Sequence, residues 1–287
     1  MILVGRAPAL ASLRRPSISG LPQRLRHKKS MLALATALVV NVVVQRVMKA
    51  PEALLSRLAL TPGTATGSRR LAVVMGQLGD FDSLEYAQAL VPRLDSLRSQ
   101  GVTVQVFAIG DAAGADRFCG FTGFPRQQLQ VDPAPTLHGQ LGLEAGLTLP
   151  GGPWPGFLLM CAGVGSPGTL QEVFRGYTGD RQAPQLFADD DLVQASPLPS
   201  FRGRMFRRAG GDGFQRPFEL ATWRLRNMNE VLGNWRTYVP CDDYITQRGA
   251  TYLLDSDDTL LYQHRDKSLL GYSETMAQPL AFLDQFI

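Results

Sequence analysis

Between residues 69 and 142, continuous apolar runs alternate with segments whose apolar positions recur at helical spacing. Residues 71–75 are short, uninterrupted and rich in β-branched side chains, which predicts a strand buried on both faces of a sheet. Apolar residues at 84, 87, 91, 94 and 97 predict a helix ending at Gly101, and residues 102–109 form a second apolar run. Parallel neighbours need a crossover helix of this length, so we predict adjacent parallel strands with a right-handed crossover.

The predicted helix starts at the turn Gly79-Asp-Phe-Asp-Ser83. Asp82 is followed three residues later by Glu85, a capping-box spacing that predicts Asp82 as the residue capping the helix. The amino end of a helix also stabilises a thiolate, but this turn contains two carboxylates and no cysteine. Ser83 is the turn's one oxygen nucleophile and has no histidine close in sequence to act as its base. We therefore expect a structural role for this turn.

The flanking segments continue the alternation of strands and helices. Residues 129–131 predict a third strand and 136–141 a helical turn, while 251–254 and 260–264 predict a β-hairpin around an acidic turn. A closing helix is expected over 275–286. The fold class is therefore α/β.

A long insertion, at about residues 144–240, separates the third strand from the hairpin. Residues 157–177 predict two helical pieces separated at Gly165-Ser-Pro167, and 218–232 predict another helix. Residues 182–213 are rich in Pro, Asp, Arg and Gly and predict a long surface loop. Four arginines in this loop form a basic cluster that we interpret as solvated: Arg202, Arg204, Arg207 and Arg208.

Charge is distributed unevenly along the 287 residues. Residues 1–51 contain nine Lys or Arg and no acid, whereas the remainder holds 20 basic and 25 acidic residues. A basic tail on a mildly acidic body argues against a nucleic-acid-binding core and for a targeting or membrane-surface segment. We therefore divide the chain into a tail, residues 1–66, and a domain, residues 67–287.

Within the tail, residues 1–30 have the Arg- and Ser-rich, acid-free composition of an organellar transit peptide. Residues 31–44 are apolar except at Thr36 and Asn41, and are shorter than the roughly 20 residues that span a bilayer. The segment fits a signal sequence, an interfacial helix or a helix packed on the body. The compartment is a chloroplast or other organelle if the source is eukaryotic, and the cytoplasm or membrane periphery if it is bacterial with translation starting at Met31.

Cysteine and histidine are sparse. Cys119, Cys161 and Cys241 are far apart and form no C-x-x-C pair, which fits a reducing compartment. The three histidines show no metal-ligand spacing, so neither a metal nor a cofactor is expected: His27, His138 and His264.

The order of elements and four local strings resemble the peroxiredoxin-like branch of the AhpC/TSA superfamily, which has a thioredoxin-like fold. The strings are Phe118-Cys-Gly-Phe-Thr-Gly-Phe-Pro125, Leu129-Gln-Val-Asp-Pro133, Leu137-His-Gly-Gln-Leu-Gly-Leu143, and Ala250-Thr-Tyr-Leu-Leu254 with Leu260-Leu-Tyr-Gln-His-Arg-Asp266. The resemblance covers about residues 69–143 and 225–285. It implies a thioredoxin-like domain carrying a long insertion.

Redox-active members of this family carry a cysteine where the first long helix begins, and this chain has none at 79–83. We therefore expect a redox-degenerate binding or accessory module with a protein or membrane-surface partner, reached through the tail or the insertion. The alternative is a thiol-dependent peroxidase or reductase using Cys119, with the charge of Arg117 lowering the thiol pKa. Cys161 or Cys241 would then resolve the oxidised thiol.

Overall fold

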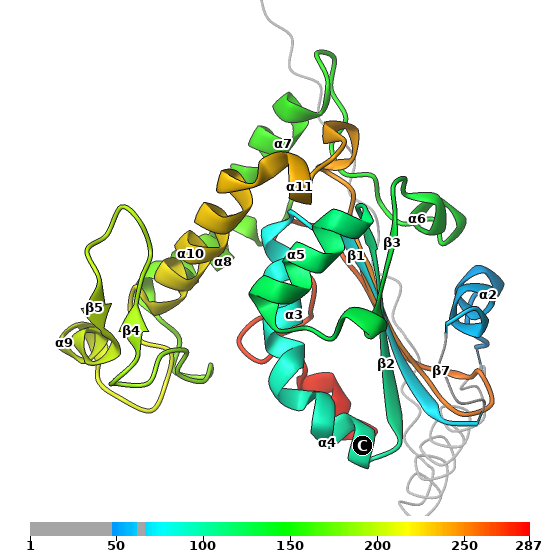
Figure 1. The fold of residues 1–287 in the computed structure, drawn as a ribbon, viewed down its shortest axis with the longest axis horizontal. Helices are drawn as coiled ribbons and strands as arrows, with labels where there is room; N and C mark the ends of the chain where they lie inside the picture. The colour runs from blue at the N-terminus through cyan, green and yellow to red at the C-terminus, as the bar shows by residue number, and fades with distance from the viewer. Residues whose placement is uncertain (1–47, 62–66) are drawn as a thin grey trace, which may run out of the picture. The chain divides into compact units, whose positions relative to one another are not determined.

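The computed structural model describes residues 48–61 and 67–287, whose centre is a five-stranded mixed sheet (Figure 1). The strand order is β3-β2-β1-β6-β7. β1 pairs in parallel with β2, and β2 with β3, whereas β6 runs antiparallel to β1 and β7 antiparallel to β6. The predicted parallel pair and the predicted hairpin are thus confirmed. The strands are β1 (Arg69–Gln77), β2 (Val102–Ile109), β3 (Leu129–Asp132), β6 (Ala250–Leu254) and β7 (Leu260–Arg265).

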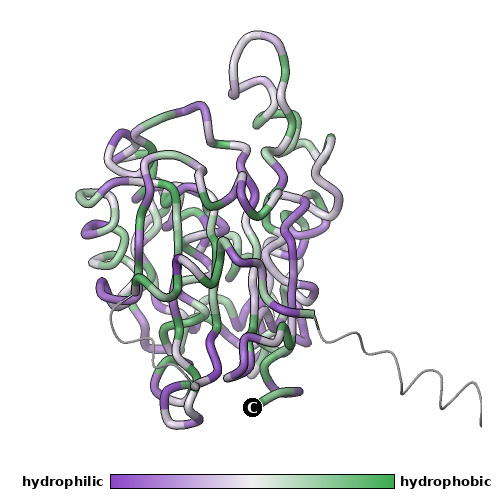
Figure 2. Tube along the Cα trace, turned by 90° about the vertical axis from the view of Figure 1, so that its right-hand side faces the viewer, coloured by the Kyte–Doolittle hydropathy of each residue, from purple (hydrophilic) through white to green (hydrophobic). Residues whose placement is uncertain are grey.

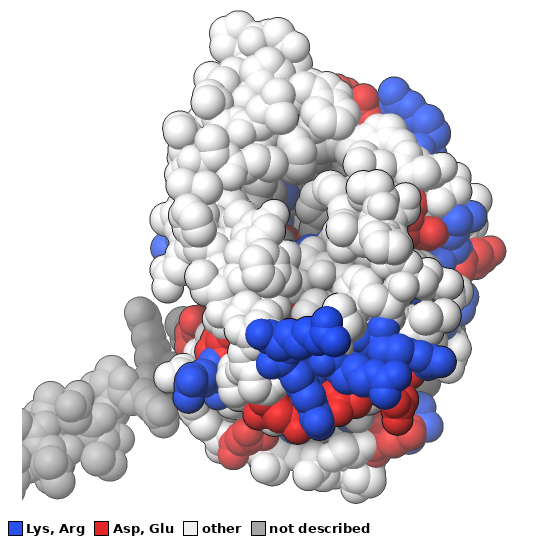
Figure 3. All heavy atoms as spheres, turned by 90° about the vertical axis from the view of Figure 1, so that its left-hand side faces the viewer, with Lys and Arg blue, Asp and Glu red and all other residues white. Residues whose placement is uncertain are grey.

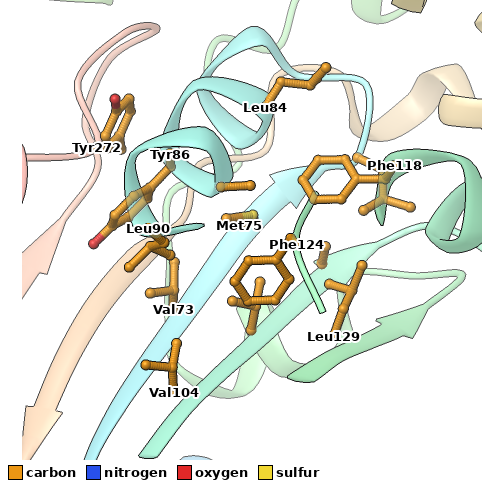
Figure 4. Packing of buried hydrophobic residues seen from close by; sticks show 14 of the residues in the cluster. Val73, Met75, Leu84, Tyr86, Leu90, Val104, Phe118, Phe124, Leu129 and Tyr272 are labelled. Atoms are coloured by element: carbon orange, nitrogen blue, oxygen red, sulfur yellow. The ribbon is translucent and has the colours of Figure 1, made fainter. Parts of the chain in front are cut away.

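Alternate residues of β1 enter two different cores. Leu71, Val73 and Met75 belong to the larger core, whereas Ala72 and Val74 belong to the smaller one on the opposite face. Figure 4 shows the larger core, in which side chains from the sheet meet those of α3 and α5. Figure 2 shows hydrophobic residues concentrated along the central strands. A strand buried on both faces needs the continuous apolar run that the sequence has there.

Helices cover both faces of the sheet (Figure 1). The larger core lies under α3 (Phe81–Leu90), α4 (Leu94–Ser99) and α5 (Ala112–Thr122). The smaller core lies under α2 (Glu52–Ala59) and α6 (Thr136–Gln140).

Two of the predicted helices differ in the structure. The first is divided into α3, the 3-10 turn η1 (Val91–Arg93) and α4, because Pro92 lacks the N–H that a continuous helix needs. The helix expected over 275–286 is wrong: only the 3-10 turn η5 (Ala281–Gln285) forms. Pro279 lies in the middle of that segment and disfavours helical backbone at Gln278.

The insertion contains the three predicted helices and further short helices. They are α7 (Pro153–Cys161), α8 (Thr169–Thr178) and α10 (Glu219–Gly233), followed by the short α11 (Trp235–Tyr238) and η4 (Asp242–Tyr244).

The loop predicted over 182–213 is folded rather than solvated throughout. It forms strands β4 (Leu192–Val193) and β5 (Phe201–Arg202), the turn η3 (Gly203–Phe206) and the short helix α9 (Arg207–Gly210). Phe187, Val193 and Phe206 make a small core there. The fully buried Arg216 holds this loop by donating to the Phe187 carbonyl and to Glu219. These contacts join residues distant in sequence, so the local composition did not indicate them.

Residues 48–60, which the sequence analysis assigned to the tail, pack on the sheet. Residues 48–287 form one unit, and Leu54 and Leu58 of α2 are fully buried in the smaller core. The tail segments 1–30 and 31–44 lie outside the described residues. Among the helices that the structure describes, none has the length and apolarity to cross a membrane.

We predict that Leu54→Ala lowers the free energy of unfolding by about 2–5 kcal/mol, because it leaves a cavity in the smaller core. Leu60→Ala is the matched control, since Leu60 lies just beyond α2 and is 75% exposed. Urea denaturation of both variants measures the difference. Equal midpoints would mean that α2 does not belong to the folded body.

Candidate functional site

The candidate site lies where β1 ends and α3 begins, at the carboxyl edge of the parallel strands. Two acidic side chains from this turn, Asp80 and Asp82, point into the protein with side chains only 9% and 11% exposed. The turn is tight at Gly79, where an added Cβ would collide with Val239 beyond α11. Glycine is therefore required for α11 to pack against the amino end of α3.

The predicted cap at Asp82 is wrong. α3 begins at Phe81 after Asp80, and no side chain makes a capping hydrogen bond to it. Asp82 instead lies in the first turn and accepts a hydrogen bond from the Leu270 backbone N–H at 2.7 Å. Asp80 Oδ2 accepts from the Gln77 backbone N–H at 3.0 Å, within the turn itself. The capping-box spacing did not reveal that a long-range partner competes for Asp82.

That partner is the guanidinium of Arg248, which comes just before β6 and has a side chain only 2% exposed. Its Nη1 donates to Asp82 Oδ2 at 3.1 Å, and its Nη2 lies 3.5 Å from Asp80 Oδ2. Its Nε donates to the Thr246 carbonyl at 2.9 Å. A buried guanidinium needs such partners, because an unpaired buried charge is strongly destabilising.

A third carboxyl, that of Asp266, completes the cluster from just beyond β7. Its Oδ2 accepts from the Gly249 backbone N–H at 3.2 Å. Its Oδ1 is buried without a hydrogen bond and lies 3.8 Å from His264 Nε2. A cavity of about 10 Å³, room for one water molecule, lies between Asp266, the other two carboxyls and Arg248.

Burial dominates the protonation of these carboxyls. It raises the pKa of Asp80 to about 7, of Asp82 to about 6 and of Asp266 to about 8, while Arg248 opposes the rise in each case. Three acids share one guanidinium in the protein interior, where charges are weakly screened, so they cannot all be ionised at little cost. At neutral pH the cluster therefore retains at least one proton.

The outer side of the turn faces a pocket of about 220 Å³ between α3, α7 and α11. Its walls include Trp154, Phe157 and Trp235, and its charged residues are Asp80 and Asp82. The rings of Trp154 and Trp235 lie 5.3 Å apart, and their indole N–H groups donate to the two oxygens of Asp242. The pocket thus has aromatic walls and an acidic floor.

Cys119 and Arg117, the site residues predicted from sequence, lie on α5 and away from this pocket's lining. Burial raises the pKa of Cys119 to about 11, and Arg126 is the cation that opposes the rise. Arg117 points elsewhere, with its Nε donating to Glu230 Oε1 at 2.7 Å. The structure therefore does not bring the guanidinium of Arg117 to the Cys119 thiol.

Cys161 lies in the insertion and Cys241 directly follows it, and all three thiols are free. Cys161 lines the aromatic pocket together with Asp80 and Asp82. Although the residue as a whole is exposed, burial of its thiol group raises the pKa. Cys241 is half-buried, and its carbonyl accepts a hydrogen bond from Gln77 Nε2.

Within residues 48–61 and 67–287, no three His, Cys, Asp or Glu residues gather in a way that could hold a metal ion. His138 is buried on α6 and its Nε2 contacts the Met75 carbonyl at 2.7 Å. His264 contacts the Gly271 carbonyl. His27 lies in the part of the chain that is not described.

The sequence analysis missed Arg248, Asp266 and the aromatic walls. Arg248 could have been suspected as a site residue, because only one glycine separates it from a strongly apolar strand. An added Cβ at Gly249 would collide with the Val74 carbonyl, so this glycine brings the backbone of Arg248 against β1. Asp266 and the tryptophans carried no sequence signal, since they reach the site from other elements.

We predict that Asp266→Asn flattens the pH dependence of stability. The folded carboxyl has a pKa of about 8, above its unfolded value, so its contribution is present below about pH 4 and is lost as pH rises toward 8. Relative to the variant, the wild type should lose up to about 1.4 kcal/mol of unfolding free energy per pH unit over this window. Urea denaturation from pH 4 to 8 measures both proteins, and parallel curves would show that Asp266 is not protonated in the fold.

Comparison with known proteins identifies the domain. Residues 89–268 match the family described as AhpC/TSA antioxidant enzyme. The match starts within α3 and therefore includes Cys119, Cys161 and Arg248 but not the turn at 79–83. A search of curated proteins gave no match.

The fold agrees with that match. A five-stranded mixed sheet between helices, extended by an insertion after β3, is consistent with a thioredoxin-like domain. The matched residues include more than half of the chain, and the chain belongs to the AhpC/TSA antioxidant enzyme family.

Proposed function

We propose that this protein is a binding or accessory member of its family, in which the amino end of α3 does not serve as a thiol redox centre. The proposal is carried by the ion-paired cluster of Asp80, Asp82 and Arg248 at that position. The end of a helix where a thiolate would gain most from the dipole faces two carboxylates. These carboxylates are already paired with the buried guanidinium of Arg248.

The electrostatics of the thiols support this proposal. Nucleophilic attack on a peroxide requires a thiolate, and its formation is favoured by nearby positive charge. Burial raises the pKa of Cys119 to about 11 and also raises that of Cys161. Neither thiol is therefore substantially ionised near neutral pH.

The alternative function is a thiol-dependent peroxidase or reductase using Cys119. Its thiol would need a conformational change that exposes it, because the residue is buried among the aromatic side chains of the larger core. Cys161 is the thiol placed at the α3 pocket, but its neighbours there include two carboxylates. A thiol assay with single variants separates these candidates.

We expect weak or no consumption of hydrogen peroxide with an added thiol donor, because burial raises the pKa of the Cys119 and Cys161 thiols. Any activity that is measured should vanish in Cys119→Ser and persist in Cys161→Ser and Cys241→Ser, which serve as matched controls. Robust turnover that survives Cys119→Ser would contradict both the binding role and the Cys119 mechanism. Loss of activity in Cys161→Ser would place the reaction at the α3 pocket.

We propose that the insertion provides the surface for a protein or membrane-surface partner. Apolar side chains of α7 and α8 lie exposed to solvent, and Leu158 and Phe174 are 63% and 64% exposed. Beside α8, an apolar hollow of about 590 Å³ is lined by Tyr177, Phe218 and Met228. Figure 3 shows a hollow on this side, in a surface with few charges. Exposed apolar surface of this kind marks interaction sites.

Two of the four arginines in the basic cluster below this surface already have partners within the protein. Arg207 pairs with Asp189 and Asp212, and the Arg202 guanidinium donates to the Asp190 carbonyl. Figure 3 shows acidic residues interleaved with the basic ones there. We therefore propose that this surface binds its partner through apolar contact.

To test the membrane-surface partner, the intact protein is sedimented with anionic lipid vesicles. We expect Phe174→Asp to reduce the bound fraction severalfold, because a charge on the exposed face of α8 opposes apolar contact. Leu60→Asp is the control, since Leu60 is also exposed, at 75%, but lies beyond α2. If the wild-type protein does not sediment with the vesicles, a membrane-surface partner is excluded and a protein partner is the one that the proposal retains.

A further inference from the structure

The pocket between α3, α7 and α11 combines two features that rarely meet in a protein interior. Its walls are apolar and aromatic, with Phe81, Trp154, Phe157 and Trp235 among them. Its floor is formed by Asp80 and Asp82, the charged residues among the described residues that line it. An apolar pocket with a few placed polar groups is the usual form of a small-molecule site.

The carboxyls at the floor belong to a cluster with too little positive charge. The side chains of Asp80, Asp82 and Asp266 are 9%, 11% and 9% exposed, and Arg248 is the guanidinium they share. The Oδ1 atom of Asp266 has no hydrogen-bond partner, and this residue lines the small cavity that also reaches Asp80 and Asp82. A second cation at the floor would remove the charge imbalance that now favours protonation of the cluster.

The aromatic walls suit the same kind of ligand. The faces of tryptophan rings attract organic cations, and closely spaced rings form the cages that bind alkylammonium groups. The Trp154 and Trp235 rings lie 5.3 Å apart and are held by hydrogen bonds to Asp242. Both indole N–H groups are thereby directed to one carboxylate, so the pair is fixed before any ligand arrives.

We propose that this pocket binds a small organic amine as its ammonium ion, with the charged group against Asp80 and the apolar body against the aromatic wall that Trp154, Phe157 and Trp235 form. This inference deepens the proposed binding function by naming the ligand class of the same site. The volume of about 220 Å³ accommodates a single ring or a short alkyl chain. The ammonium group donates to the floor carboxylate, and the apolar body replaces water along the aromatic walls.

Other ligand classes fit this pocket less well. A carboxylate or phosphate would be repelled by Asp80 and Asp82. A divalent metal prefers a shell of several oxygen, nitrogen or sulfur donors, and the described residues contain no group of three such acids, histidines or cysteines suited to it. A neutral ligand would fill the apolar walls without balancing the acidic floor.

The test is isothermal titration calorimetry of the full chain at pH 8 with three ligands of one shape: benzylammonium, benzyl alcohol and benzoate. We expect benzylammonium to bind and the other two to bind at least tenfold more weakly. A Gly-Lys-Gly peptide supplies the same ammonium group from a polypeptide. Equal affinity for benzyl alcohol, or tighter binding of the peptide than of benzylammonium, would overturn the assignment to a small amine.

Two variants and one control locate the site. Asp80→Asn preserves shape and should weaken benzylammonium at least tenfold, and Trp154→Leu should weaken it severalfold. Trp154 is partly exposed, so its replacement provides a test even if Asp80→Asn does not fold. Asp95→Asn is the control, because the Asp95 side chain is 99% exposed on α4. Unchanged affinity in a folded Asp80→Asn or Trp154→Leu protein would contradict the site.

The pH dependence gives an independent readout. Benzylammonium should bind more weakly at pH 5.5 than at pH 8, because Asp80 and Asp82 take up protons as pH falls. The groups facing these carboxyls are Arg248 before β6, Asp266 after β7, Glu85 on α3 and Arg224 on α10. Equal affinity at the two pH values would contradict an ionised acidic floor.

The triple variant Cys119→Ser, Cys161→Ser, Cys241→Ser separates this inference from the proposed function. Benzylammonium binding should persist in it, because no thiol contributes charge to the site. Peroxide turnover in the wild type together with preserved amine binding would overturn the proposed function alone. Absence of amine binding in the wild type without turnover would overturn the inference alone.

Discussion

The buried guanidinium of Arg248 is the interaction on which the site depends, because it ties two separate segments into one interior cluster that a third segment joins. It joins the approach to β6 with the turn between β1 and α3, through Asp80 and Asp82. Asp266 beyond β7 reaches the same place by accepting from the Gly249 backbone. Without these partners the buried charge of Arg248 would be unpaired, which is strongly destabilising. The ion pairs therefore fix the position of the amino end of α3.

The insertion is attached to the domain by a second set of polar contacts. Arg224 of α10 donates two hydrogen bonds to the Glu85 carboxylate on α3, and one to the Glu172 carbonyl on α8. Gln88 of α3 receives hydrogen bonds from Trp223 and Asn227 of α10. α3 therefore carries polar partners for the insertion on one side and apolar residues for the larger core on the other. α10 leads into α11, and Leu232 and Trp235 from these two helices line the aromatic pocket.

Most of the central architecture followed from periodicity. Residues 71–75 and 102–109 are apolar without interruption, and strands with that pattern are stable in the middle of a sheet with both faces covered. The hairpin of β6 and β7 was predicted by its acidic turn, and α7 and α8 were predicted as two helical pieces separated at Gly165-Ser-Pro167; the helix predicted over 218–232 is α10. The helix expected over 275–286 did not form because of Pro279, and the surface loop predicted over 182–213 also contains short strands, a 3-10 turn and a small core that its composition did not indicate. α2 was assigned to the tail because a short amphipathic helix has the same sequence pattern in a tail as on the face of a sheet.

By itself, the sequence determined the fold class, the parallel centre, the position of the insertion and the absence of a cysteine at the start of α3. These features depend on residues that are close together in sequence, and the spacing of hydrophobic residues indicates such local structure directly. The tertiary structure alone decided that Asp82 binds Arg248 instead of capping a helix, that Arg117 turns to Glu230, and that Cys161 lies beside the α3 turn. The reason is physical: burial and ion pairing depend on which distant segments the sheet brings together, and these determine the charge of a carboxyl or a thiol.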